Sequence, residues 1–200
     1  MDICYKTGYM GEDMTGRDLF NDKLLFGYLF CLYYPRYEPE NGFVAVDTDK
    51  GKVAGYILGT CDTLNQRKKL ILKMGWRIFL RIIFVTIWNY PETIRSLFQF
   101  AGNIRTKVGF DQISREYPAH LHINILPGYQ RMGIGEKLLN TFEDNIRHCA
   151  RGIHLATTDE NIKATPFYHK NGYTIIKRCK LNTWMGKRNV NSIIYAKKLY

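Results

Sequence analysis

Hydrophobic positions in the first sixty residues alternate between strand-like and helix-like spacing. Residues 3–11 predict an opening strand, and residues 17–34 predict a helix with apolar positions three or four residues apart. Two further strand-like runs, 42–47 and 52–61, flank the turn sequence Thr-Asp-Lys-Gly at 48–51. This arrangement predicts a β-hairpin.

The last eighty residues show the same alternation. Residues 120–126 alternate in hydrophobicity and stop at Pro127-Gly128, as a strand does. The elements predicted after it are an amphipathic helix, a short strand, a short helix closed by Asn171-Gly172 and two final strands, at 133–150, 153–157, 161–170, 173–181 and 192–199.

The predicted order of elements is β-α-β-β-insertion-β-α-β-α-β-β. Such an order indicates a mixed α/β (α+β) protein built around a single sheet. The length of 200 residues predicts a single domain that covers residues 1–200. Residues 62–119 exceed what a simple connection needs, so they predict a helical insertion between the hairpin and the next strand.

The segment 70–100 inside this insertion is strongly apolar. Arg77, Arg81 and Pro91 interrupt it, so it is too short to span a bilayer. One interpretation is a helix largely buried against the domain. The other is a helix that docks on a membrane surface or a partner and carries its basic residues on one stripe.

Composition and charge narrow the class of protein. Hydrophobic residues make up 46% of the chain, which allows a real core, and the net charge is +11. Residues 1–61 carry −3, residues 62–119 carry +6 and residues 120–200 carry +8. The excess predicts an anionic partner. Nucleic acid is disfavoured because zinc-finger spacing, basic-zipper heptads and RNP-like strands are all absent.

The cysteines predict a reduced, cytoplasmic protein. There are five of them, an odd number, and they lack the paired spacing of metal or redox sites. The N-terminus lacks a basic stretch followed by an apolar one, so no signal peptide is expected.

A glycine-containing loop follows the strand at 120–126 and precedes the long helix. Glycines let successive backbone N–H groups turn inward, and the first turn of a helix leaves its own N–H groups unpaired. Such a loop favours an anion, a pyrophosphate above all. It is neither a Walker A loop nor the dinucleotide fingerprint.

Two motifs together resemble the GNAT superfamily of acyl-CoA N-acyltransferases. They are Gln130-x-x-Gly133-x-Gly135 and Asn161-x-x-Ala164-x-x-Phe167-Tyr168-x-x-x-Gly172-Tyr173. The resemblance covers residues 120–176 and implies one mixed, largely antiparallel sheet flanked by helices. The run from Tyr117 to Ile123 is also similar to the acetyltransferase-like domains related to those appended to O-GlcNAcases.

The resemblance implies acetyl-CoA as the acetyl donor and assigns residues to it. The backbone of Ile125 and Leu126 would bind the pantetheine arm as an added strand does. Asn161 and Ala164 would line the pantetheine channel. The backbone amides that would hold the pyrophosphate belong to Arg131, Met132, Gly133, Ile134, Gly135 and Glu136.

Candidate catalytic residues follow from the same resemblance. Tyr168 would lie near the thioester sulfur and give a proton to the departing thiolate, or else it is only a core aromatic. His120 and His122 are candidates for the general base, or else they are partly buried polar residues satisfied by neighbours. Glu116, Glu38 and Glu40 are weaker candidates.

These observations predict an N-acetyltransferase acting on a primary amine of a small molecule or peptide. The amine would attack acetyl-CoA directly in a ternary complex, without a metal. The acidic first third, with Tyr33, Tyr34, Tyr37 and Glu38, would face the amine. The alternative is a non-catalytic acyl-CoA-binding or interaction domain that docks through the basic apolar insertion, and a homodimer stays open.

Overall fold

The computed structural model describes residues 1–103 and 109–200, which form one six-stranded sheet in the order β1-β2-β3-β4-β6-β5. Its strands are β1 (Gly42–Asp47), β2 (Lys52–Thr60), β3 (Ala119–Ile125), β4 (Gly152–Thr158), β5 (Thr174–Trp184) and β6 (Lys187–Lys198). Only β3 and β4 run parallel, and the other neighbours are antiparallel. This confirms the predicted single mixed, largely antiparallel sheet.

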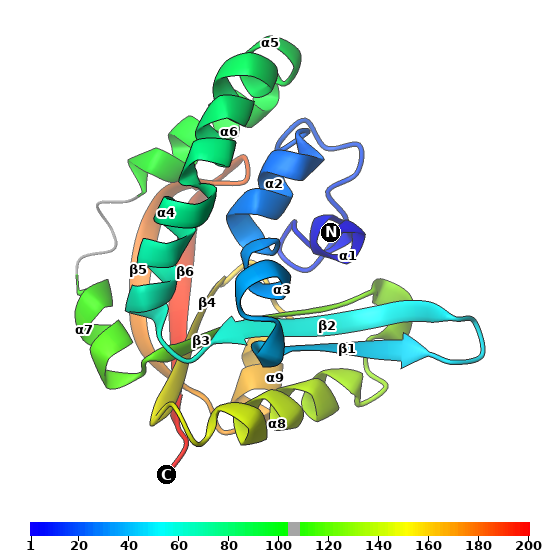
Figure 1. Cartoon of the computed structure of the whole chain (residues 1–200), viewed down its shortest axis with the longest axis vertical. Helices are drawn as coiled ribbons and strands as arrows, with labels where there is room; N and C mark the ends of the chain where they lie inside the picture. The colour runs from blue at the N-terminus through cyan, green and yellow to red at the C-terminus, as the bar shows by residue number, and fades with distance from the viewer. Residues whose placement is uncertain (104–108) are drawn as a thin grey trace.

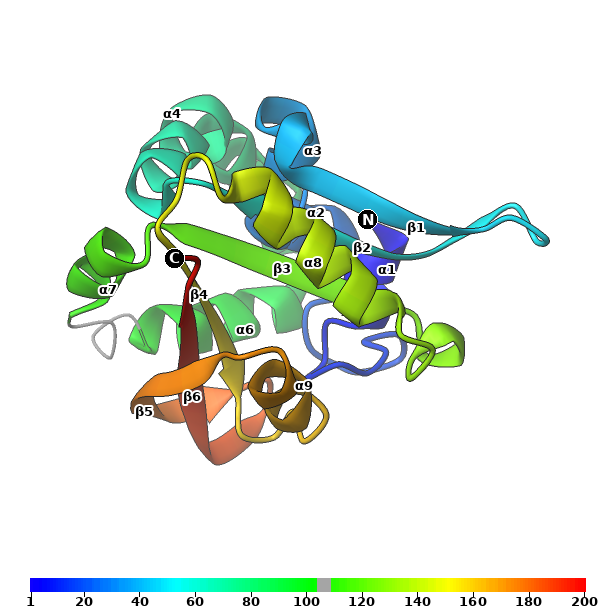
Figure 2. The same cartoon turned by 90° about the horizontal axis from the view of Figure 1, so that it is seen from below.

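The sheet opens between β3 and β4. These strands pair only at Ala119↔Ile153 and His120↔His154, and β4 then turns away from β3 (Figures 1 and 2). On its other side β3 pairs with β2 over most of its length, through Ile125. Since backbone groups alternate in direction along an antiparallel strand, those of Ile123 and Ile125 point into the opening.

Helices cover both faces of the sheet. On one face α8 (Ile134–Ile146) and α9 (Ala164–Lys170) build a core with the strands. On the other lie the N-terminal helices α1 (Asp2–Lys6), α2 (Lys23–Phe30) and α3 (Tyr33–Tyr37), followed by the short η1 (Pro39–Asn41). Strand β2 serves both cores because its side chains alternate. Ile57 packs in the first core, whereas Tyr56 and Leu58 pack in the second.

The predicted insertion is present between β2 and β3. It consists of α4 (Thr63–Arg81), the π-helical turn η2 (Ile82–Thr86), α5 (Ile87–Asn89), α6 (Pro91–Gly102) and α7 (Phe110–Glu116). Residues 104–108 of the predicted insertion lie outside the described part. The helical backbone continues from α4 through the π-turn η2 to Asn89, and it ends at Tyr90, before Pro91 begins α6. Helix α6 then returns toward the sheet, so that the end of the insertion near α5 projects from the body (Figure 1).

The first interpretation of segment 70–100, a helix largely buried against the domain, is wrong. Most of its large apolar side chains are exposed, among them Leu72, Phe84 and Trp88. Within α4 only Thr63, Gln66 and Met74 are buried. None of the helices in the described ranges is long and apolar enough to cross a membrane.

The N-terminal predictions are also corrected. Residues 3–11 are not a strand, because the chain forms α1 and then turns through Met10 and Gly11, both at positive φ. The helix predicted over 17–34 begins only at Lys23. Asp22 caps it by accepting a hydrogen bond from the Leu25 N–H at 3.0 Å.

Elsewhere the local predictions are confirmed with small shifts at their ends. The hairpin at β1 and β2 is present, α8 ends at Ile146 rather than at residue 150, and α9 begins at Ala164 rather than at 161. Gly172 follows α9 with a φ of +81°, the left-handed conformation expected there.

The prediction that all five cysteines are reduced is wrong for two of them. Cys61, at the end of β2, and Cys149, after α8, form a disulfide. Cys4, Cys31 and Cys179 are free thiols. The bond joins residues 88 positions apart, a separation that carries no sequence signal of pairing.

Candidate active site

A run of unpaired backbone N–H groups lies where β3 leads into α8. The chain passes through the short η4 (Pro127–Tyr129), reaches Arg131 at a φ of +63° and enters the helix at Gly133 with a φ of +76°. Lys137 makes the first intrahelical hydrogen bond, to the Gly133 carbonyl at 3.1 Å. Among the described residues, the N–H groups of 131–136 donate no hydrogen bond.

This run fits a pyrophosphate. The N–H groups are consecutive, exposed to a ligand and aligned with the positive end of the α8 dipole. Gly133 has open space where a Cβ would stand, while a Cβ at Gly135 would come within 3.3 Å of the Phe167 ring. Gly133 thus leaves room for a ligand, and Gly135 allows α8 to pack closely on α9.

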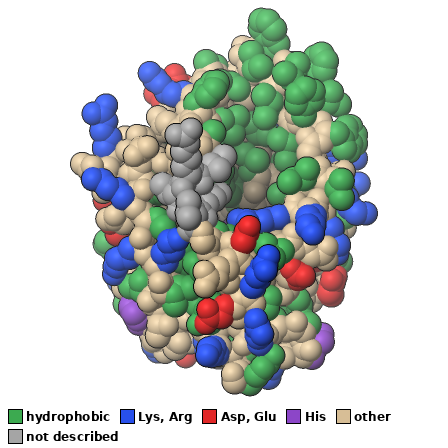
Figure 3. Space-filling model, turned by 90° about the vertical axis from the view of Figure 1, so that its left-hand side faces the viewer, with side chains coloured by type: hydrophobic (Ala, Val, Ile, Leu, Met, Phe, Trp, Pro, Cys, Tyr) green, Lys and Arg blue, Asp and Glu red, His purple; other side chains and the backbone are tan. Residues whose placement is uncertain are grey.

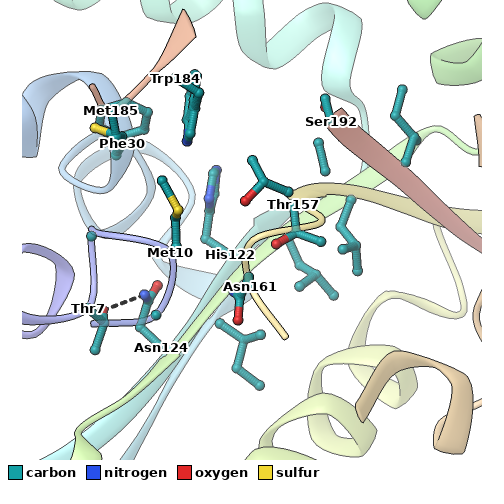
Figure 4. A pocket seen from close by; sticks show the side chains of 18 of the residues that line it. Thr7, Met10, Phe30, His122, Asn124, Thr157, Asn161, Trp184, Met185 and Ser192 are labelled. Atoms are coloured by element: carbon teal, nitrogen blue, oxygen red, sulfur yellow. Dashed lines mark hydrogen bonds between the residues drawn. The ribbon is translucent and has the colours of Figure 1, made fainter. Parts of the chain in front are cut away.

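A cavity of about 430 Å³ lies at the opening between β3 and β4 (Figure 4). Its floor comes from both strands, with Leu121 to Asn124 on one side and Leu155 to Thr158 on the other. Its wall comes from the N-terminal segment, the tip of the β5–β6 hairpin and the ends of α2 and α6. The apolar lining residues there are Met10, Phe26, Phe30, Phe100, Trp184 and Met185.

His122 lines this cavity and His120 lies behind it. The two alternate positions put both rings on one face of β3, with their centroids 5.6 Å apart. Both ring nitrogens of His120 are engaged, Nε2 with the Tyr34 hydroxyl at 2.5 Å and Nδ1 with Thr63 Oγ1 at 2.9 Å. The ring of His122 has no hydrogen-bond partner in the described chain.

Both histidines are held neutral. Burial lowers the pKa of His122 to about 4, and burial together with the neighbouring His122 and His154 lowers the pKa of His120 well below its usual value. A neutral imidazole with a free nitrogen can accept a proton from a bound substrate. Among the histidines of residues 1–103 and 109–200, only His122 presents such a nitrogen to the cavity.

Tyr168 reaches the same cavity from α9. Its side chain is 8% exposed and stacks among other aromatics, with the Tyr195 ring at 5.3 Å and the Tyr173 ring at 5.7 Å. Burial raises the pKa of Tyr168, so the phenol keeps its proton. Its hydroxyl has no partner among the described residues, which leaves it able to donate toward the cavity.

The remaining predicted contacts separate into two groups. The carbonyl of Ile125 accepts a hydrogen bond from Gln130 Nε2 at 3.0 Å, which leaves the N–H of Ile125 directed into the opening. Asn161 lines the cavity beside Gly11. The N–H of Leu126 donates instead to the Ala54 carbonyl at 2.9 Å, so it is not free to bind a ligand. Ala164 is buried in the core and does not line the cavity.

The first third of the chain lines the cavity, but its acidic residues do not face it as predicted. Tyr33 and Tyr34 are buried, and Glu38 accepts a hydrogen bond from the Tyr33 hydroxyl at 2.8 Å. No aspartate or glutamate is among the described lining residues, so neither Glu38, Glu40 nor Glu116 contributes to it. The charged lining residues are Arg67 and Lys177, which are basic.

Several lining residues could not be found from the sequence. Asn124 donates to Thr7 Oγ1 and thereby fixes the N-terminal segment against β3, as the dashed line in Figure 4 shows. His154, from β4, lies behind the cavity with its ring 5.9 Å from that of His120. These contacts join segments far apart in the chain, and no local sequence pattern predicts them. The described part holds no cluster of His, Cys, Asp and Glu suited to a metal ion.

Comparison with known proteins agrees with this geometry. Residues 97–175 match the family model described as an acetyltransferase (GNAT) domain. The crystal structure of SsHAT is similar over 100% of this chain and 91% of its own, with 26% identity and a TM-score of 0.72.

Two further solved structures share the fold. Naa20 from Chaetomium thermophilum, in complex with a bisubstrate analogue, is 18% identical over 86% of this chain and 72% of its own, with a TM-score of 0.52. The NatB acetyltransferase complex bound to CoA and MES is 16% identical over 84% and 78%, with a TM-score of 0.50.

Proposed function

We propose that the chain is a GNAT-type acetyltransferase that takes acetyl-CoA as its acetyl donor and acetylates a primary amine of a small molecule or peptide. The match of residues 97–175 to the GNAT family model and the similarity to SsHAT support this proposal. The observation that carries the proposal is the joint placement of two elements. The unpaired N–H run at 131–136 suits the pyrophosphate of the donor, and the cavity holds a free base, His122, and a protonated phenol, Tyr168.

The proposed reaction is a direct attack in a ternary complex. The amine nitrogen forms a bond to the thioester carbonyl carbon, and the carbon–sulfur bond then breaks. His122 takes the proton that the nitrogen loses, and Tyr168 gives its proton to the departing thiolate. The products are an amide and free coenzyme A, and no oxidant, reductant or metal is required.

Positioning supplies much of the rate in such a mechanism. The backbone of Ile123 and Ile125, directed into the sheet opening, would align the pantetheine arm by β-augmentation. Holding the thioester beside the amine removes the entropy cost of bringing the two together. His120, fixed by Tyr34 and Thr63, would position His122 rather than touch the substrate.

The cavity also favours a class of acceptor. Its wall is aromatic and sulfur-rich, and no carboxylate in the described lining would attract a polycation. We therefore expect an amine that carries an apolar, preferably aromatic, group. A polyamine would bring further ammonium groups into a cavity whose charged residues are Arg67 and Lys177.

The experiment is a thiol-release assay with acetyl-CoA and a panel of amines. We expect phenethylamine and related arylalkylamines to release free coenzyme A, and spermidine to release far less. Release with none of the amines, despite binding of acetyl-CoA, would favour the alternative of a non-catalytic acyl-CoA-binding domain. The exposed apolar insertion is the observation that favours a docking role in either case.

The proposal also includes a domain organisation and a cellular location. We treat residues 1–200 as one domain with the insertion at 62–119, and we place the protein in the cytoplasm, where its donor acetyl-CoA is made and used. The three free cysteines support that location. The Cys61–Cys149 disulfide is the observation against it, since such bonds are rare in reducing compartments. The narrower resemblance to the domains appended to O-GlcNAcases stays a prediction.

A further inference from the structure

The insertion carries a surface that the proposed acetyl transfer does not use. We call it the apolar ridge, formed by large exposed side chains of α4, η2, α5 and α6, namely Leu72, Trp76, Phe79, Phe84, Trp88 and Phe98. Leu72 is 79% exposed, Trp88 77% and Phe84 69%. Figure 3 shows hydrophobic side chains gathered at the upper end of the molecule, where α5 lies in Figure 1. Single exposed apolar residues are ordinary, but a contiguous set of this size marks a binding surface.

The part of the ridge that α4, η2 and α5 form is basic and contains no acidic residue. From Thr63 to Pro91 there are six lysines and arginines and neither aspartate nor glutamate. Two of the six are paired within the protein, Arg67 with Asp111 at 3.4 Å and Arg81 with Asp22 at 2.7 Å. The other four, Lys68, Lys69, Lys73 and Arg77, form no ion pair within residues 1–103 and 109–200.

The lysines lie beside the ridge rather than far from it. Lys68 and Leu72 are one helical turn apart on α4, and Lys69 and Trp76 are two turns apart. Each pair therefore shares a side of the helix. The exposed surface of α4 is therefore basic toward its N-terminal end and apolar toward η2. This pattern of Trp, Phe and Leu beside Lys and Arg is typical of helices that lie in the interface of an anionic membrane.

The geometry of the ridge distinguishes a membrane from a protein partner. Ile71 and Leu80 are nine residues apart on α4, about two and a half turns, so they lie on opposite sides of the helix. Both are exposed, by 70% and 41%. A protein partner would cover one side of such a helix, whereas lipid can surround all of its apolar sides. A second copy would bring two basic stretches together, which costs repulsion.

We propose that the apolar ridge docks the protein on the surface of a bilayer containing anionic phospholipid. The aromatic and aliphatic side chains enter the headgroup region, and Lys68, Lys69, Lys73 and Arg77 contact the phosphates. The buried pair of Asp22 and Arg81 fixes α4 to the body, so the ridge is presented in one orientation. The contact is interfacial, and it does not depend on acetyl transfer.

Sedimentation with vesicles tests the proposal on the full chain. Wild type should bind vesicles of phosphatidylcholine mixed with phosphatidylserine, bind those of phosphatidylcholine alone far less, and lose affinity in added salt. Phe84→Ser with Trp88→Ser should lower the partition coefficient at least tenfold. Lys68→Gln with Lys69→Gln should lower it roughly fivefold for each lysine, which corresponds to about 1 kcal/mol each.

Matched controls keep the outcome unambiguous. Val44→Ser with Val53→Ser removes two exposed apolar side chains from the β1–β2 hairpin, away from the ridge, and should leave vesicle binding unchanged. All variants should bind acetyl-CoA as wild type does, which shows that they are folded. Wild type that binds neither vesicle overturns the proposal. So does a concentration-dependent dimer in size-exclusion chromatography that the Phe84 and Trp88 changes abolish, because it assigns the ridge to a second copy.

Discussion

Arg81 donates hydrogen bonds to the carboxylate of Asp22 from two nitrogens, Nε at 2.9 Å and Nη2 at 2.7 Å, although the two residues are 59 positions apart. Asp22 is completely buried, and it also caps α2 and accepts a hydrogen bond from Thr86 at 2.7 Å. One carboxylate therefore connects the N-terminal helices to the insertion.

Asp22→Asn should be strongly destabilising. It removes the negative charge and leaves the Arg81 guanidinium without its counter-ion in a largely buried site, which costs about 3 kcal/mol or more of the free energy of unfolding. Urea unfolding measures it. Asp144→Asn is the control, because its pair with Arg147 is exposed and should change stability by less than about 0.5 kcal/mol. Equal effects of the two changes would contradict the structural role of the pair.

The same carboxylate should make the fold acid-sensitive below about pH 4. Burial raises the pKa of Asp22, but the hydrogen bonds from Arg81, Leu25 and Thr86 outweigh it, and the net pKa is lowered. A lowered pKa means stability that is complete above the ordinary carboxyl pKa and is lost as pH falls through the folded value. Unfolding followed by circular dichroism in this pH range should show that the free energy of unfolding of wild type falls as pH is lowered. The free energy of unfolding of Asp22→Asn should fall less, because the variant lacks the titrating carboxylate.

The histidines should produce a separate loss of stability at higher pH. Burial lowers the pKa of His122 and of His154 to about 4, from 6.5 in the unfolded chain. Between these values the unfolded state binds more protons, so the free energy of unfolding should fall as pH is lowered from about 6.5 to about 4.

Removing one buried histidine should reduce the steepness of this fall by about one proton. His154→Gln tests it by urea unfolding across the range, and His148→Gln, at an exposed position after α8, is the control. An identical pH slope in wild type and His154→Gln would show that His154 does not titrate differently on folding.

His122 and His120 should differ in their effect on acetyl transfer. His122→Gln removes the proposed base that faces the cavity and should lower kcat about a hundredfold or more at neutral pH. His120→Gln should lower it much less, because both ring nitrogens of His120 are engaged and its proposed role is to position His122. Steady-state thiol release measures both. A larger loss of kcat in His120→Gln than in His122→Gln would indicate that His120 is the base.

Tyr168→Phe should slow turnover about a hundredfold or more with little change in the Kd for acetyl-CoA, because only the proposed proton donor is lost. Isothermal titration and thiol release separate the two quantities. Tyr195→Phe is the matched control, since that tyrosine lies in the same aromatic cluster but its hydroxyl donates a hydrogen bond to Thr165 Oγ1 at 2.9 Å. A fully active Tyr168→Phe would exclude Tyr168 as the donor.

Gly133→Trp should weaken acetyl-CoA binding by at least tenfold, because the indole would occupy the space in front of the unpaired N–H groups. The change also strains a residue at a φ of +76°. Gly16→Trp controls for that strain, as Gly16 has a φ of +77° and equally open surroundings but does not line the cavity. Unchanged affinity in Gly133→Trp would remove the loop from the donor site.

Local signals explain what the sequence could predict. The hairpin, β3, α8 and the glycine loop each depend on residues close together in the chain, such as the turn at 48–51 or Gly133 before Ile134. The geometry of the loop, with its free N–H groups, follows directly from glycine and helix-start chemistry.

Long-range contacts explain what it could not. The N-terminal residues look extended in isolation, but Thr7 is held by Asn124 and Asp22 by Arg81, and these partners lie 117 and 59 positions away. The sequence also could not predict that the apolar side chains of the insertion are exposed, because exposure depends on contacts between distant parts of the chain. An apolar helix has one sequence pattern whether its partner lies in the same chain or outside it.

The opening between β3 and β4 gives the sheet an incomplete edge inside the molecule. The backbone of Ile123 and the N–H of Ile125 have no strand to pair with there, whereas the carbonyl of Ile125 accepts a hydrogen bond from Gln130 Nε2 at 3.0 Å. A pantetheine arm that fills this gap would add a further surface to the cavity as well as bring the acetyl group. We therefore expect an obligatory order of binding, with acetyl-CoA first and the amine second, and with free coenzyme A as a competitor of the donor alone.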